Sequence, residues 1–198
     1  MLALLATACA GHAVADGDSP ATAPAAAARA PCEEERETRR HPGCTGERYR
    51  DLDFWLGDWD VVLRVRKSPD KDEWAVSRGV NRISSLLGGC AVEERFSAEG
   101  PGQPWAGRSL SRWVESEKRW RQAWVDDTGS YIALTGGMQG KDMVLTGEPF
   151  VRDGKPVQMR MVFTDIAASS LSWRWERTVD AGATWTPMMF IEYRRSSR

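Results

Sequence analysis

The chain has 198 residues, 41% of them hydrophobic and 28% charged, which is enough for one globular domain with an added segment. Its formal charge is -1, its pI is near 6.2, and Lys and Arg are interspersed with Asp and Glu. No long-range field attracts polyanions, so we expect no nucleic-acid partner. No apolar run reaches the roughly 20 residues that cross a bilayer, so we expect no transmembrane helix.

Residues 1–50 differ in composition from the rest and are predicted to form a disordered leader. An apolar, small-residue start is followed by an Ala- and Pro-rich tract and then by a run of charges, a composition that builds no core. The residues before Cys9 resemble a bacterial lipobox, which makes Cys9 the predicted lipidation site, although the positive start of a secretory signal is missing. We expect a periplasmic or lipid-anchored envelope protein that contacts a membrane only through this anchor.

The cysteines are consistent with export. Cys32 and Cys44 form a close-spaced pair in the leader and Cys90 stands alone in the domain. An oxidising periplasm would let Cys32 and Cys44 close a small loop, while the alternative leaves both unpaired. The sequence has two histidines, none of them beyond residue 49, and no Cys-x-x-Cys spacing. We therefore expect no metal site and no cofactor, haem included.

From residue 51 to residue 198 the chain changes to short segments in which apolar and polar residues alternate. Gly, Pro and Asp separate these segments, as in all-β folds. Short links make consecutive strands antiparallel neighbours, and closing the sheet removes its edges. We predict an up-and-down antiparallel barrel of about ten strands, wide enough to hold a cavity. A two-sheet sandwich without a cavity is the alternative. The predicted strands are 59–67, 73–83, 91–97, 108–114, 119–126, 131–136, 142–147, 157–164, 170–179 and 187–194.

Five motifs occur in order between residues 52 and 194. They are DFWLGDWDV at 53–61, Gly-Cys-x-x-x-Glu at 89–94, WRQAWVD at 120–126, Met-x-Leu-x-Gly at 143–147 and Thr-x-Asp-x-Gly-x-Thr-Trp at 178–185. Their combination resembles a bacterial calycin-like family of unknown function. The resemblance implies a lipocalin-like barrel and brings no established chemistry.

The Gly-x-Trp of the first motif implies a structural plug. In lipocalin-like barrels this Trp fills the closed end and often meets an Arg of the last strand, a contact worth roughly 0.5 to 2 kcal/mol. Trp59 would be the plug, with Arg194 or Arg195 as its partner.

The last motif also matches the Asp-box, a stabilising β-hairpin turn. Asp180 would cap the amides of the turn, Gly182 would supply a positive φ, and Trp185 completes the pattern. Because such a box is a fold element, it does not indicate glycosidase activity.

Strand alternation predicts the cavity wall. Glu94 shares its face with apolar neighbours, and Gln122 shares its face with Trp124, so all three are expected to point inward. A buried carboxylate needs a partner, and Arg160 is the first candidate, although the alternation of its own strand points Arg160 outward. We therefore predict a ligand site of Glu94, Gln122, Trp124 and Arg160. The alternative is a structural polar network that only fixes the barrel.

The function predicted from these features is the binding of a small apolar or amphipathic molecule. One alternative is a small-molecule enzyme that uses Glu94 as a general acid or base, since an apolar wall would raise its pKa. Another is a structural or interaction protein of the envelope. The domain has no nucleophile elbow, phosphate loop or metal-ligand cluster, which favours binding over catalysis.

Overall fold

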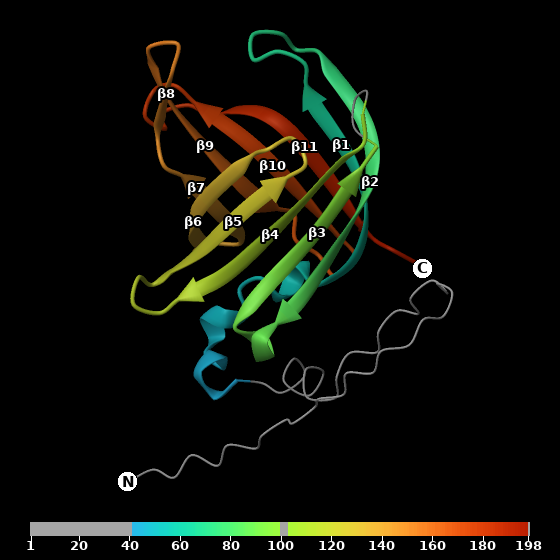
Figure 1. The fold of residues 1–198 in the computed structure, drawn as a ribbon, viewed down its shortest axis with the longest axis vertical. Helices are drawn as coiled ribbons and strands as arrows, with labels where there is room; N and C mark the ends of the chain where they lie inside the picture. Colours follow the sequence, from blue (N-terminus) through green and yellow to red (C-terminus); the bar gives the residue numbers. More distant parts are fainter. Residues whose placement is uncertain (1–40, 100–102, 198) are drawn as a thin grey trace, which may run out of the picture.

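The computed structural model describes residues 41–99 and 103–197; the predicted lipidation site Cys9 and the leader before residue 41 lie outside this part. The described chain forms four short 3-10 helices and eleven strands (Figure 1). No helix in these ranges has the length and apolar character to cross a membrane. The helices are η1 Pro42–Cys44, η2 Glu47–Arg50, η3 Asp53–Trp55 and η4 Leu87–Gly89. The strands are β1 Gly57–Arg66, β2 Trp74–Leu86, β3 Ala91–Ala98, β4 Trp105–Val114, β5 Arg119–Asp126, β6 Tyr131–Gln139, β7 Asp142–Gly147, β8 Phe150–Arg152, β9 Lys155–Thr164, β10 Ser170–Thr178 and β11 Thr186–Arg195.

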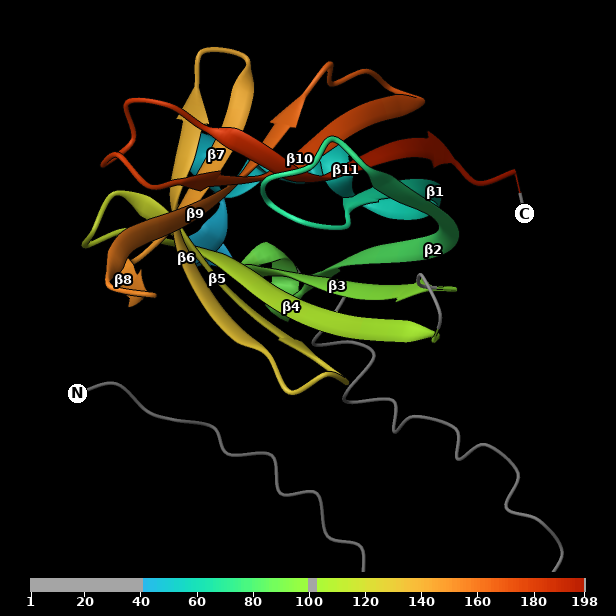
Figure 2. The same cartoon turned by 90° about the horizontal axis from the view of Figure 1, so that it is seen from above.

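Ten of these strands close into an antiparallel barrel. Strands β1 to β7 pair in sequence, β7 pairs with β9, β9 with β10, β10 with β11, and β11 returns to β1. Seen from above, the strands surround the short N-terminal helices, which lie at the far end (Figure 2). This closure confirms the predicted up-and-down barrel and excludes the two-sheet sandwich.

Strand β8 was not predicted. It forms a short hairpin with the start of β9, outside the ring, and all three of its residues are exposed. A three-residue strand with no buried face has no alternation that a sequence could reveal.

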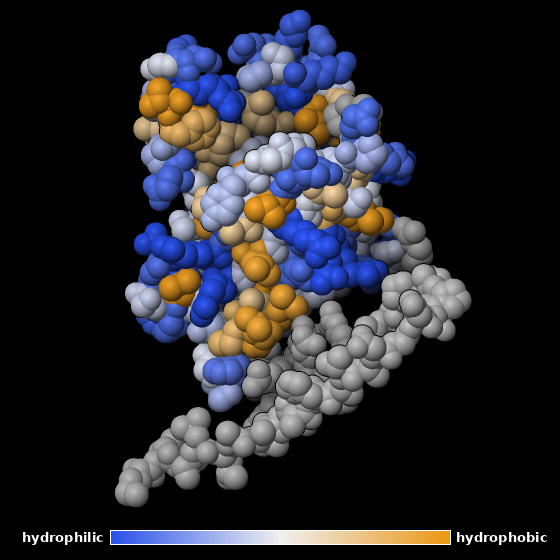
Figure 3. Space-filling view, viewed as in Figure 1, coloured by the Kyte–Doolittle hydropathy of each residue, from blue (hydrophilic) through white to orange (hydrophobic). Residues whose placement is uncertain are grey.

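Alternation builds the interior of the barrel. Along β4, Gly107, Ser109, Ser111 and Trp113 are buried while the residues between them are exposed. Such a period of two places every second side chain inside the ring. The outer face shown in Figure 3 carries mostly hydrophilic residues, interrupted by smaller hydrophobic patches.

Trp59 and Arg195 lie together at the closed end of the barrel. Trp59 is buried, its indole nitrogen donates to the carbonyl oxygen of Trp55 at 2.7 Å, and the guanidinium of Arg195 lies 3.7 Å from the centre of its ring. Arg195 also donates to the carbonyl oxygens of Phe54 and Leu56. Of the two arginines considered from the sequence, Arg195 therefore holds the position over the plug.

Gly57, the glycine of the Gly-x-Trp motif, is required by this arrangement. Its φ of +116° is strained for residues with a side chain, and a Cβ there would overlap the Nη1 atom of Arg195. The motif thus combines a special backbone conformation with the space that the arginine needs.

The disulfide corrects the cysteine prediction. Cys44 is bonded to Cys90, with 5.1 Å between their Cα atoms, so Cys90 does not stand alone and Cys44 does not pair with Cys32, which lies outside the described residues. The reason is that residues 41–50, assigned to the leader from composition, pack against the closed end. Cys44 and Tyr49 are buried there, and the His41 amide donates to the carbonyl of Gly88.

The turn between β10 and β11 has the contacts that its sequence motif predicts. Asp180 accepts from the amide of Thr184 at 2.9 Å and from its hydroxyl at 2.6 Å, and it also accepts from the hydroxyl of Thr178. Gly182 has a φ of +91°. The hydroxyls of Thr178 and Thr184 lower the pKa of Asp180 to about 2.

Candidate functional site

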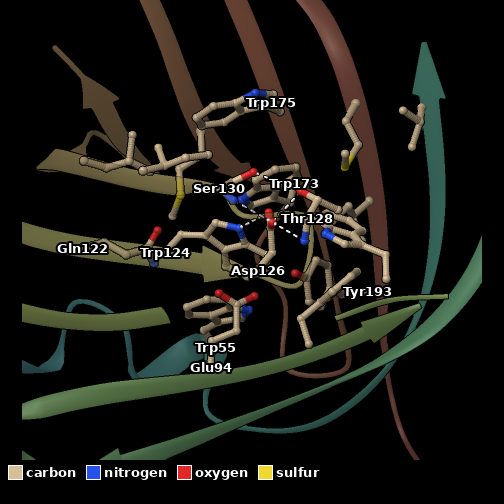
Figure 4. A pocket seen from close by; sticks show the side chains of 18 of the residues that line it. Trp55, Glu94, Gln122, Trp124, Asp126, Thr128, Ser130, Trp173, Trp175 and Tyr193 are labelled. Atoms are coloured by element: carbon tan, nitrogen blue, oxygen red, sulfur yellow. Dashed lines mark hydrogen bonds between the residues drawn. The ribbon is translucent and has the colours of Figure 1, made fainter. Parts of the chain in front are cut away.

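The barrel holds a cavity of about 670 Å³. It reaches from Trp55 of η3 to the β5–β6 turn, where Asp126, Thr128 and Ser130 contribute to its wall (Figure 4). Most of the lining is apolar, from strands β1, β3 to β6 and β9 to β11. Its aromatic lining residues are Trp55, Phe96, Trp105, Trp124, Trp173, Trp175 and Tyr193.

Glu94 reaches this cavity from β3, as alternation predicted. Figure 4 shows it near Trp55, on the side away from Trp175. The side chain is 6% exposed, and its two oxygens accept from Asn81 Nδ2 at 2.8 Å and from Ser109 Oγ at 2.7 Å. Burial raises the pKa of Glu94 to about 7, although both hydrogen bonds act in the opposite direction. A carboxyl group with a pKa near neutral pH can hold or release a proton at this position in the apolar wall.

A polar network connects four strands behind Glu94. Asn81 of β2 also donates to the hydroxyl of Tyr193 on β11, at 3.1 Å. Burial, followed by the charge of Glu94, raises the pKa of Tyr193 well above its usual range, so the phenol stays neutral. Ser109 of β4 lies directly opposite Glu94 in the strand register. Asn81 and Ser109 were not predicted, because alternation shows that a residue points inward but not which residue it faces.

Gln122 and Trp124 lie on the cavity side of β5, as predicted. Gln122 is 5% exposed and donates to Ser111 Oγ at 2.9 Å. The ring of Trp124 lies over Gly107 of β4, where any Cβ would overlap it. Gly107 therefore allows the indole to pack flat against the wall.

A capped turn forms part of the cavity mouth between β5 and β6. Asp126 accepts from the indole nitrogen of Trp124 at 3.0 Å, from the amide and hydroxyl of Thr128, and from the amide of Ser130 (Figure 4). Burial opposes ionisation of Asp126, but these donors outweigh it and hold its pKa well below the usual range. The carboxylate is thus charged at neutral pH. From the sequence, Asp126 was placed only at the end of the predicted strand 119–126, with no role in the cavity.

Arg160 does not belong to the cavity wall. It alternates with Met161, which lines the cavity, and its Nε atom donates to Glu176 at 2.6 Å. Its guanidinium also lies 4.0 Å from the ring centre of Trp185. Arg160 neither pairs with Glu94 nor lines the cavity, so both predictions are corrected. The alternation of its own strand had pointed Arg160 outward, as observed. Glu94 accepts hydrogen bonds from neutral donors and has no cationic partner among the described residues.

Potential metal ligands converge at one place in the described part of the chain. Ligand atoms of His41, Cys44 and Cys90 lie within 4.8 Å of one another. The disulfide bond occupies both sulfur atoms. Because thiolates are the form that binds metals, this group is not a metal site in its oxidised state.

A family model described as "Protein of unknown function (DUF1579)" matches residues 45–195. No curated protein matches the chain.

Proposed function

This chain belongs to the family described as a protein of unknown function (DUF1579), which brings no activity with it, and we propose from the cavity itself that the barrel binds a small apolar or amphipathic molecule. The proposal includes a calycin-like mode of binding, in which the guest enters an interior plugged at one end by Trp59.

The observation that carries the proposal is the open, mostly apolar interior. Its volume of about 670 Å³ lies within the range of roughly 300 to 1,000 Å³ that is common for ligand pockets. Ligand sites combine apolar walls with a few convergent polar groups, and here Glu94 and Gln122 supply these groups below the aromatic wall. The hydrogen bonds to Asn81, Ser109 and Ser111 hold both side chains in place, so little ordering would be required on binding.

A pair of variants tests binding in the interior. Native mass spectrometry of protein purified from its own host should show a co-purified small molecule, and Ile132→Trp should remove it by filling the cavity. Ile132 lines the cavity, whereas its neighbour Tyr131 is 72% exposed, so Tyr131→Trp is the matched control and should retain the guest. Retention of the guest by Ile132→Trp, or no guest in the parent protein, would count against the proposal.

A second candidate is an enzyme in which Glu94 acts as a general acid or base. It is favoured by the pKa of about 7 of a carboxyl that lines the cavity, because proton transfer is most effective when the pKa is near the working pH. For any substrate found, Glu94→Gln should abolish turnover, while Glu93→Gln on the outer face of the same strand should not. Equal turnover in both variants would exclude this role.

Export to the cell envelope remains part of the proposal. The Cys44–Cys90 disulfide supports it, because such bonds persist in oxidising compartments. Lipidation at Cys9 would hold the barrel at a membrane. Cell fractionation should then find the parent protein with membranes and Cys9→Ala in the soluble periplasmic fraction; the same distribution for both would contradict the anchor.

A further inference from the structure

The charged groups of the cavity wall have one sign. Among the lining residues that the structure describes there is no Lys, Arg or His, whereas Glu94 lies inside and Asp126 at the mouth. Arg177 shares the strand face of Trp173 and Trp175 but does not line the cavity, and its buried Nε atom has no hydrogen-bond partner among the described residues. A fatty acid or other anion would therefore enter an apolar space with no cation to receive it.

Glu94 places a carboxyl group at this end of the cavity wall. Both oxygens of Glu94 have neutral donors, and no cation contacts them among the described residues. Two other buried atoms there have no hydrogen-bond partner in the described chain, the acceptor Oδ1 of Asn81 and the donor Nε1 of Trp55. A carboxylate in a low-dielectric interior interacts strongly with any positive charge that reaches it. This part of the wall would favour a guest that carries a positive charge.

The aromatic wall provides a second kind of attraction for a cation. Five of the ten tryptophans of the chain line the cavity. Trp173 and Trp175 lie parallel, with 6.2 Å between their ring centres. The ring centres of Trp105 and Trp124 are 5.8 Å apart. Indole faces are the best cation acceptors among side chains, and their attraction increases when water is excluded.

We propose that the natural guest is an organic ammonium compound, a molecule with an apolar body and a protonated or quaternary nitrogen, held by the indole faces and by the carboxylate of Glu94. The inference rests on the proposed binding function and specifies its ligand class. The positive group would lie among the tryptophans above Glu94, and the apolar body would contact residues such as Ile132, Leu134 and Met161. The net charge of the chain is only -1, so the attraction would arise in the cavity and not from a general surface field.

Three probes with the same alkyl chain and different head groups test this choice: decylamine, decanol and decanoate. Binding to the full chain is followed by tryptophan fluorescence and by calorimetry. We expect decylamine, charged at neutral pH, to bind at least about tenfold more tightly than decanoate and more tightly than decanol. If decanoate or decanol binds as well as decylamine, the ammonium inference is overturned while the binding function stands. If none of the three binds, the proposed function fails and the inference fails with it.

Two cavity variants test whether the preference for decylamine over decanol arises at Glu94 and the tryptophans. Glu94→Gln and Trp175→Leu should each reduce the ratio of decylamine to decanol affinity by about threefold or more. Trp74→Leu is the control for loss of an indole, because Trp74 packs on Phe190 outside the cavity wall. It should leave the ratio unchanged. An equal effect of Trp74→Leu, or a preference that survives both cavity variants, would overturn the inference.

Discussion

Replacing Glu94 with Gln should make the barrel more stable at alkaline pH than the parent protein. Glutamine has almost the same shape and remains neutral at all pH values. Its amide can still accept a hydrogen bond from Asn81 and can donate one to the hydroxyl of Ser109, the two partners that Glu94 has now. The change therefore removes a titrating group and leaves its packing and its hydrogen bonding.

The magnitude follows from the pKa of Glu94. The ordinary value is 4.5, and burial raises it to about 7 in the folded barrel. Between these values the folded state binds more protons than the unfolded state, so the free energy of unfolding falls as the pH rises. Each pH unit between the two pKa values corresponds to about 1.4 kcal/mol. The full effect, present below pH 4.5 and lost above about pH 7, is on the order of 3 kcal/mol.

Urea unfolding followed by tryptophan fluorescence, at a series of pH values, measures this effect. Relative to the parent protein, Glu94→Gln should gain about 3 kcal/mol in free energy of unfolding between acidic pH and about pH 8. Glu93→Gln, which removes a carboxylate from the outer face of the same strand, should show no such gain. Parallel pH profiles for the parent protein and Glu94→Gln would refute the reasoning, because burial could not then be penalising the charged form.

Two further predictions concern the closed end. Converting both Cys44 and Cys90 to Ala should lower the free energy of unfolding by about 4 kcal/mol, because the bond joins residues 46 positions apart and restricts the unfolded chain; an unchanged urea midpoint would contradict this. Gly57→Ala should cost about 1 to 3 kcal/mol, measured by thermal unfolding, because it combines a φ of +116° with an overlap with Arg195. Gly137→Ala, where a Cβ meets nothing within 4 Å, is its control, and equal losses in the two variants would show that the position of Gly57 is not special.

Much of the architecture is determined by the sequence itself, because alternation is a local property. A strand with a period of two assigns each side chain to one of two faces without knowledge of its neighbours. This was enough to predict ten barrel strands and to place Glu94, Gln122 and Trp124 on the cavity side. The Asp-box was equally readable, since its residues contact partners a few positions away or adopt a defined backbone conformation. The plug role of Trp59 followed from the resemblance to lipocalin-like barrels, because its partner Arg195 is distant in the chain.

Only the tertiary structure decided which distant groups meet. Glu94 faces Ser109 because β3 and β4 pair in a particular register. The cationic partner predicted for Glu94, Arg160, forms its ion pair with Glu176 instead. Cys44 meets Cys90 because the segment before the barrel packs against its closed end. Register, closure and docking are set by hydrogen bonds and contacts between segments far apart in the chain, and no local period encodes them.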